Sequence, residues 1–160
     1  MSADKITRQE LVHLLVKRQA HMTFEDSVAN FPQAHINTRP PHIEYTFWHL
    51  LEHLRICQWD ILDYIRNSNY QSREWPAEYW PPHDQETDWA GWNKSIEEFL
   101  ADRQALVDIV QDSATDLYTP IPHGYGGHTI LREIHVVSAH NAYHIGEMGI
   151  LRSVMDLWKT

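Results

Sequence analysis

The chain is 160 residues long, carries a formal net charge of −9 at neutral pH, and is 42% hydrophobic. That length suits one domain, and this balance of apolar and charged residues is typical of a folded globular protein. An acidic chain without a basic cluster repels phosphate backbones, which excludes broad nucleic-acid binding. The single Cys57 excludes an internal disulfide and every zinc site built on paired cysteines. We therefore expect one domain over residues 1–160.

The N-terminal segment and the apolar runs indicate where such a protein resides. The first residues, MSADKITRQELVHLL, are charged and polar where a signal peptide needs an apolar run. No stretch approaches the roughly 20 apolar residues that cross a bilayer. We expect a cytoplasmic protein that does not act at a membrane.

Apolar residues with helical spacing predict four long helices. Thr7-Arg8-Gln9-Glu10 has the pattern of a capping box, so the first helix is expected to begin near Thr7 and to fade by Asn30. A loop with three prolines follows over residues 31–42. The second helix is expected from about Ile43 to Arg66, with an apolar seam that suits a bundle.

A long connection rich in Trp, Pro and Tyr follows, roughly over residues 70–87, and is expected to form an aromatic lid at the end of the bundle. The third helix is predicted from near Asp88 to Ser113, and Thr129 is expected to cap the fourth. No segment alternates as a half-buried strand does. The predicted fold is all-α: a four-helix bundle with a long Trp/Pro-rich connection between helices 2 and 3.

The most unusual number in the composition is 12 His. His140 and His144 lie about 40° apart around one helix and about 6 Å apart along it, so both can bind one metal ion. His49 and His53 have the same spacing in the second helix, and His53 flanks its apolar seam. Two such helices can build a site of three imidazoles that keeps an open position, as catalytic zinc sites do. Imidazole also suits nickel, iron and copper.

Other interpretations compete with a metal site. A single His-x-x-x-His pair also occurs on helices that bind nothing, although several half-apolar histidines on facing helices favour a shared cation. His-Glu-x-x-His is absent, and a di-iron bundle needs two Glu-x-x-His motifs where this chain has only Glu10 to His13. Cys57 lies within the apolar seam and is expected to be a small core residue.

Two further residues are candidates for proton transfer. Glu147 follows His144 by three residues, so it orients an imidazole, acts as a general base, or leans toward solvent. His128 immediately precedes the fourth helix, where it covers the open coordination side or remains a solvated loop residue.

Two segments of the chain resemble the DinB-like superfamily of metal-binding four-helix proteins, also called DinB/YfiT-like. They are Leu50–Ile61 and His140–Glu147, and the likeness extends to the Trp/Pro-rich connection and to Pro122-His123-Gly124. The resemblance implies an up-up-down-down-like bundle, a homodimer, and one divalent ion held by His53, His140 and His144. The family pattern commonly has Gln where this chain has Glu147.

The resemblance also implies an activity. Relatives with an assigned activity are S-transferases and isomerases that use low-molecular-weight thiols such as mycothiol or bacillithiol. We therefore expect a metal-dependent, thiol-using transferase or a hydrolase, with zinc or nickel as the ion and Glu147 or His128 moving a proton. The alternative is a non-catalytic metal-binding or stress-response scaffold.

Overall fold

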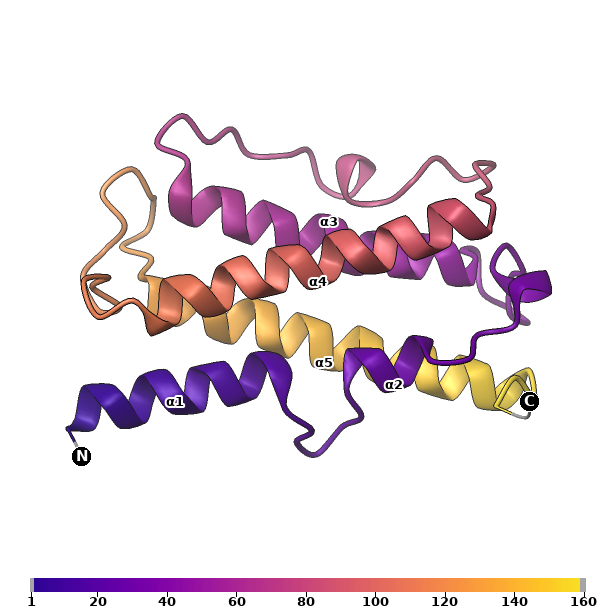
Figure 1. Cartoon of the computed structure of the whole chain (residues 1–160). Coiled ribbons are helices and arrows are strands. Elements are labelled where there is room, and N and C mark those ends of the chain that lie inside the picture. The colour runs from indigo at the N-terminus through magenta and orange to yellow at the C-terminus, as the bar shows by residue number, and fades with distance from the viewer. Residues whose placement is uncertain (1, 159–160) are drawn as a thin grey trace.

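The computed structural model describes residues 2–158, and every long element in that range is a helix (Figure 1). The four main helices are α1 (Ala3–Val16), α3 (Phe47–Arg66), α4 (Trp89–Gln111) and α5 (Ile130–Val154). Between them lie the short helix α2 (Phe24–Val28) and the 3-10 turns η1 (Gln33–His35) and η2 (Ala77–Tyr79). The described residues contain no β-strand. The prediction of an all-α four-helix bundle is confirmed.

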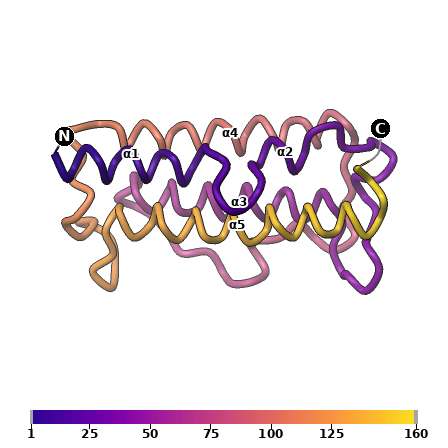
Figure 2. Tube along the Cα trace, turned by 90° about the horizontal axis from the view of Figure 1, so that it is seen from below, coloured from indigo at the N-terminus to yellow at the C-terminus, as the bar shows by residue number. Residues whose placement is uncertain are grey.

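The directions of the helices differ from the expected up-up-down-down order. Helices α1 and α5 run one way and α3 and α4 run the other, so the order is up-down-down-up (Figures 1 and 2). The α3–α4 connection (residues 67–88) makes this order feasible because an extended chain of its length spans up to about 70 Å, whereas α3 is about 30 Å long. The connection runs back along α3 instead of forming a lid at the bundle end.

The first helix departs most from the sequence prediction. It begins at Ala3, with the Ser2 hydroxyl capping the backbone of Lys5. The capping box expected at Thr7 is wrong, because Thr7 lies inside α1 and its hydroxyl donates to the Ala3 carbonyl. The predicted helix also divides in two after Val16, and a capping box at Thr23 starts α2.

The remaining helix ends follow local capping chemistry. Thr46 caps α3, which therefore begins at Phe47, four residues after the expected start. Asp88 and Thr129 cap α4 and α5 at the predicted positions, each by accepting a backbone N–H three residues on.

The core contains two clusters of buried apolar side chains, one toward each end of the bundle. A polar link crosses the middle: the Gln58 side-chain amide donates to the Phe99 carbonyl at 2.7 Å and accepts from the Asn141 amide at 3.0 Å. Because Gln58, Phe99 and Asn141 come from α3, α4 and α5, this link fixes the register of three helices at the level of the candidate site.

Phe99 supplies a test of the core. It is 1% exposed and its ring stacks on Phe24 with centroids 3.8 Å apart. We expect Phe99→Ala to lower the free energy of unfolding by about 3–5 kcal/mol, because it leaves a cavity where two helices meet. Urea unfolding measures the change. Trp75→Ala, at a side chain 67% exposed, is the matched control and should change the midpoint little.

None of the helices described for residues 2–158 combines the length and the apolar character needed to cross a bilayer.

Candidate metal centre

His53 lies in the middle of α3 and is almost completely buried, with 1% of its surface exposed. Its Nδ1 is 2.8 Å from the Tyr79 carbonyl oxygen in the α3–α4 connection. A carbonyl only accepts hydrogen bonds, so Nδ1 must carry the proton and donate it. The Nε2 lone pair of His53 therefore faces the interior of the site.

His140 from α5 meets His53 across the bundle. The two Nε2 atoms are 3.1 Å apart. The Nδ1 atom of His140 is buried and has no hydrogen-bond partner among the described residues. No neighbouring group therefore fixes which ring nitrogen carries the His140 proton, and Nε2 can present its lone pair to the same point as His53.

The His144 ring lies beside these two imidazoles, whereas the ligand atoms that lie within 4.8 Å of one another are those of His53, Cys57 and His140. The centroid of the His144 ring is 4.7 Å from that of His53 and 4.6 Å from that of His140. Its Nδ1 donates to the Glu147 carboxylate at 2.6 Å, so in the neutral imidazole Nε2 is the nitrogen that carries the lone pair. The other carboxylate oxygen accepts a hydrogen bond from the Tyr45 hydroxyl. Glu147 is thus held on both sides and fixes the orientation of His144.

The protonation states favour cation binding. Burial lowers the pKa of His53 and of His140 to about 4, so both imidazoles are neutral at pH 7 and their lone pairs are available. Burial opposes the charge on Glu147, yet the hydrogen bonds from His144 and Tyr45 leave its pKa below the usual value. The site thus places the two neutral imidazoles of His53 and His140 beside one carboxylate anion.

The geometry fits a divalent ion. Two nitrogens that each lie about 2.0–2.1 Å from one ion, at tetrahedral or octahedral angles, are roughly 2.9–3.4 Å apart. The 3.1 Å between the Nε2 atoms of His53 and His140 falls within that range. Two neutral acceptors held this close without a cation or proton between them would repel each other.

Cys57 also lies at the site, which the sequence analysis did not predict. Ligand atoms of His53, Cys57 and His140 all lie within 4.8 Å of one another, and the Cys57 sulfur is 3.5 Å from Nδ1 of His53. Cys57 follows His53 by one helical turn, so this proximity was detectable from spacing. Burial raises the pKa of the thiol to about 12, which opposes the thiolate form that metal ions bind.

The α3–α4 connection holds the outer side of His53. The Trp80 ring stacks on the imidazole with centroids 3.9 Å apart. The hydroxyls of Tyr70 and Tyr79 donate to the two carboxylate oxygens of Asp60, at 3.0 and 2.8 Å. Asp60 thereby ties the connection to α3 near the point where the Tyr79 carbonyl accepts from His53.

Two of the histidines considered in the sequence analysis lie elsewhere. His128 is near Tyr64 and Glu133, with its Nδ1 3.2 Å from the Glu133 carboxylate. It precedes His140 by 12 residues, which is about 18 Å along a helix axis, so the structure does not bring His128 to the imidazoles. His49 bonds to the Gln85 carbonyl instead of joining the cluster.

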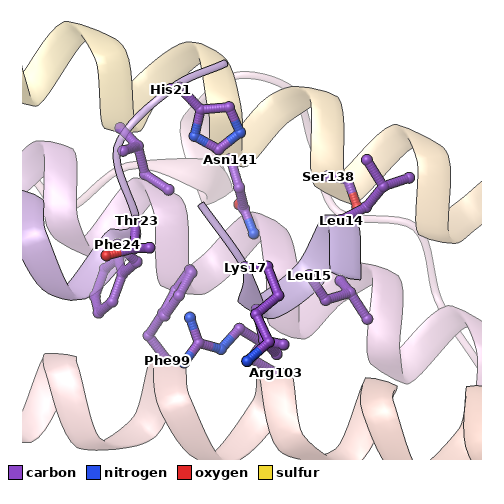
Figure 3. Close-up of a pocket in the computed structure, with 12 residues that line it drawn as sticks. Leu14, Leu15, Lys17, His21, Thr23, Phe24, Phe99, Arg103, Ser138 and Asn141 are labelled. Atoms are coloured by element: carbon purple, nitrogen blue, oxygen red, sulfur yellow. The ribbon is translucent and has the colours of Figure 1, made fainter. Parts of the chain in front are cut away.

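A small cavity lies beside the polar link of the bundle rather than at the imidazoles. It has a volume of about 20 Å³, and Leu15, Phe99, Ser138 and Asn141 are among the residues that line it (Figure 3). The Ser138 hydroxyl and the Asn141 carbonyl oxygen are buried there and have no hydrogen-bond partner within residues 2–158. This volume suits one water molecule and is too small for a substrate.

The fold and the site together define a class: helical bundles that bring histidines from two helices to one candidate metal centre. A family model, described as the DinB superfamily, matches residues 18–148. The chain therefore belongs to the DinB superfamily. No curated protein and no solved structure matched the chain.

Proposed function

We propose that this protein binds one divalent metal ion through His53, His140 and His144 and uses it to transfer a group to a small thiol or to water. The observation that carries the proposal is the meeting of His53 and His140 at 3.1 Å, with both imidazoles kept neutral by burial. Three imidazoles leave a position free for a substrate. Zinc and nickel are the ions we expect first, since both accept nitrogen ligands.

When bound, such an ion would favour the ionised, reactive form of a thiol or water. The residues of the chain orient the site. The Tyr79 carbonyl holds His53 with Nε2 inward, and the Glu147 carboxylate does the same for His144. Because both oxygens of Glu147 are engaged, its arrangement supports an orienting role more than a proton-accepting role. The position of His128 supports no role at this site.

The site is also accessible from one side. The side chains of His144 and Glu147 expose 12% and 21% of their surface to solvent. Trp75 and Tyr143 are 67% and 72% exposed, and their rings lie 6.3 Å from His53 and 4.8 Å from His144 respectively. A small substrate can therefore approach between the α3–α4 connection and α5, where two aromatic rings are available to contact it.

The proposal is tested with untagged protein. We expect elemental analysis to find close to one divalent ion per chain, and the loaded protein to accelerate the reaction of a low-molecular-weight thiol with an electrophile, or of an activated ester with water. Chelation should remove this rate, and restoring the ion should return it.

The rate of the free metal ion at the same concentration is the control. A bound ion with no rate above that control would contradict the catalytic part and favour a non-catalytic metal-binding or stress-response scaffold. Protein that binds no divalent ion would overturn the proposal.

A further inference from the structure

A hollow of about 370 Å³ opens on the outer side of α5, next to the candidate metal centre. Five residues of this helix line what we call the α5 hollow: Tyr143, Gly146, Glu147, Ile150 and Leu151. A Cβ added at Gly146 would meet nothing within 4 Å, so no side chain fills the space over this glycine. The volume lies at the lower end of the range of small-molecule sites. The α5 hollow therefore has room for part of a small ligand.

Glu147 is the one charged side chain among the described residues that line the α5 hollow. Its side chain is 21% exposed, and within residues 2–158 its ion-pair partner is His144, without a lysine or an arginine. When His144 offers its Nε2 lone pair to an ion it is neutral, so the pair keeps one negative charge. A partly buried carboxylate without a permanent cation beside it favours a ligand that brings a positive charge.

The carboxylate of Glu147 can still accept hydrogen bonds from a ligand. The Tyr45 hydroxyl donates to one of its oxygens and Nδ1 of His144 donates to the other. An ionised carboxylate has about four lone-pair sites, so each oxygen keeps one. A cation in the α5 hollow can thus pair with Glu147 while the orientation of the His144 imidazole is preserved.

The walls of the α5 hollow select the kind of cation. The Tyr143 and Ile150 side chains are 72% and 66% exposed, so an aromatic ring and an aliphatic chain are both available. An aromatic ring attracts an organic ammonium ion, and aliphatic side chains cover its alkyl groups. A calcium or magnesium ion needs several oxygen ligands, whereas this hollow offers one carboxylate. The chain's net charge of −9 further attracts cations.

We propose that the α5 hollow binds the organic ammonium group of a substrate whose reactive end reaches the candidate metal centre. The Glu147 carboxylate pairs with the ammonium, the Tyr143 ring covers it, and Ile150 contacts its alkyl groups. Because Glu147 also holds His144, the ammonium group and the reactive end lie on either side of one imidazole. The role as a substrate rests on the proposed function, but the binding of ammonium does not.

A matched pair of ligands tests the binding. Choline carries a trimethylammonium group, and its neutral analogue has a tert-butyl group of the same shape in that place. We expect choline to bind about 10-fold more tightly, because only choline gains the contact with the aromatic ring and the attraction of the carboxylate. Ligand-observed NMR titrations of the untagged full chain measure both affinities, with the divalent ion present and again after chelation.

Substitutions in the α5 hollow locate the bound ammonium. Glu147→Gln keeps the shape of the side chain and removes its charge, so most of the preference for choline should be lost. Tyr143→Leu should reduce the preference by about threefold. The matched controls are Glu10→Gln and Tyr118→Leu, at exposed residues of the same two kinds on other segments, and both should keep it. Circular dichroism verifies that each variant is folded.

A second matched pair tests the role as a substrate. Thiocholine and its neutral tert-butyl analogue are compared as thiols with the metal-loaded protein, each rate being divided by that of the free ion with the same thiol. We expect the KM for thiocholine to be about 10-fold lower, and this difference to shrink in Tyr143→Leu. Equal KM values, with rates above the free ion, would leave the proposed function standing and overturn the ammonium site.

The binding experiment also separates the two proposals in the other direction. Preferential binding of choline without any turnover would contradict the proposed function and keep the ammonium site. Choline that binds no more tightly than its neutral analogue would overturn the ammonium site. A preference that persists unchanged in both Glu147→Gln and Tyr143→Leu would place the ammonium elsewhere and overturn it as well.

Discussion

Replacing His140 with alanine is expected to remove the divalent ion from the purified protein. His140 contacts both other imidazoles, with its Nε2 3.1 Å from that of His53 and its ring centroid 4.6 Å from that of His144. Two imidazoles that remain cannot enclose the ion, and we expect affinity to fall by at least about 100-fold, beyond the 10–100-fold typical of losing an outer hydrogen-bond partner. Elemental analysis after extensive dialysis measures the loss.

His135→Ala is the matched control for this experiment. His135 lies on the same helix, but it is exposed and its ring bonds to the Leu131 carbonyl one turn back. The control removes an imidazole from α5 without touching the cluster, so the ion should remain. Full metal retention in His140→Ala would count against the assignment of this centre. Equal loss in both variants would show that the metal binds to surface histidines.

Much of the fold was predictable from the sequence because the apolar seams of α3, α4 and α5 repeat at helical spacing. Their ends were predictable where a capping side chain is present, as at Asp88 and Thr129. The first helix was predicted less well. Apolar residues continue at helical spacing past Val16, so the periodic pattern does not indicate the break between α1 and α2. Helix direction depends on the path of residues 67–88, which composition does not determine.

The candidate site was partly predictable for a related reason. His140 and His144 share one face of one helix, so their proximity follows from helical geometry alone. Their meeting with His53 requires the packing of α3 against α5, which the apolar seams only suggest. The Tyr79 carbonyl that fixes His53 and the Tyr45 hydroxyl that fixes Glu147 come from irregular segments. Such contacts depend on tertiary structure and leave no periodic signal.

The identity of the third ligand can be decided by comparing His144→Ala with Cys57→Ala. Ligand atoms of His53, Cys57 and His140 lie within 4.8 Å of one another, so a His–Cys–His set competes with the three imidazoles. We expect His144→Ala to lose most of the ion and Cys57→Ala to keep it. Burial raises the pKa of the thiol to about 12, whereas Glu147 holds His144 through Nδ1, so that Nε2 is the nitrogen available to the ion.

Cobalt substitution gives this comparison a readout that does not depend on affinity. A cobalt–thiolate bond produces an intense charge-transfer absorption in the near ultraviolet, which nitrogen and oxygen ligands lack. We expect the cobalt-loaded wild type to lack that band and to have the same spectrum as cobalt-loaded Cys57→Ala. A thiolate band that disappears in Cys57→Ala, together with metal retention in His144→Ala, would replace the three-imidazole centre with the His–Cys–His set. The ion would then hold the buried Cys57 as a thiolate, and His144 would be free to act on the substrate rather than on the metal.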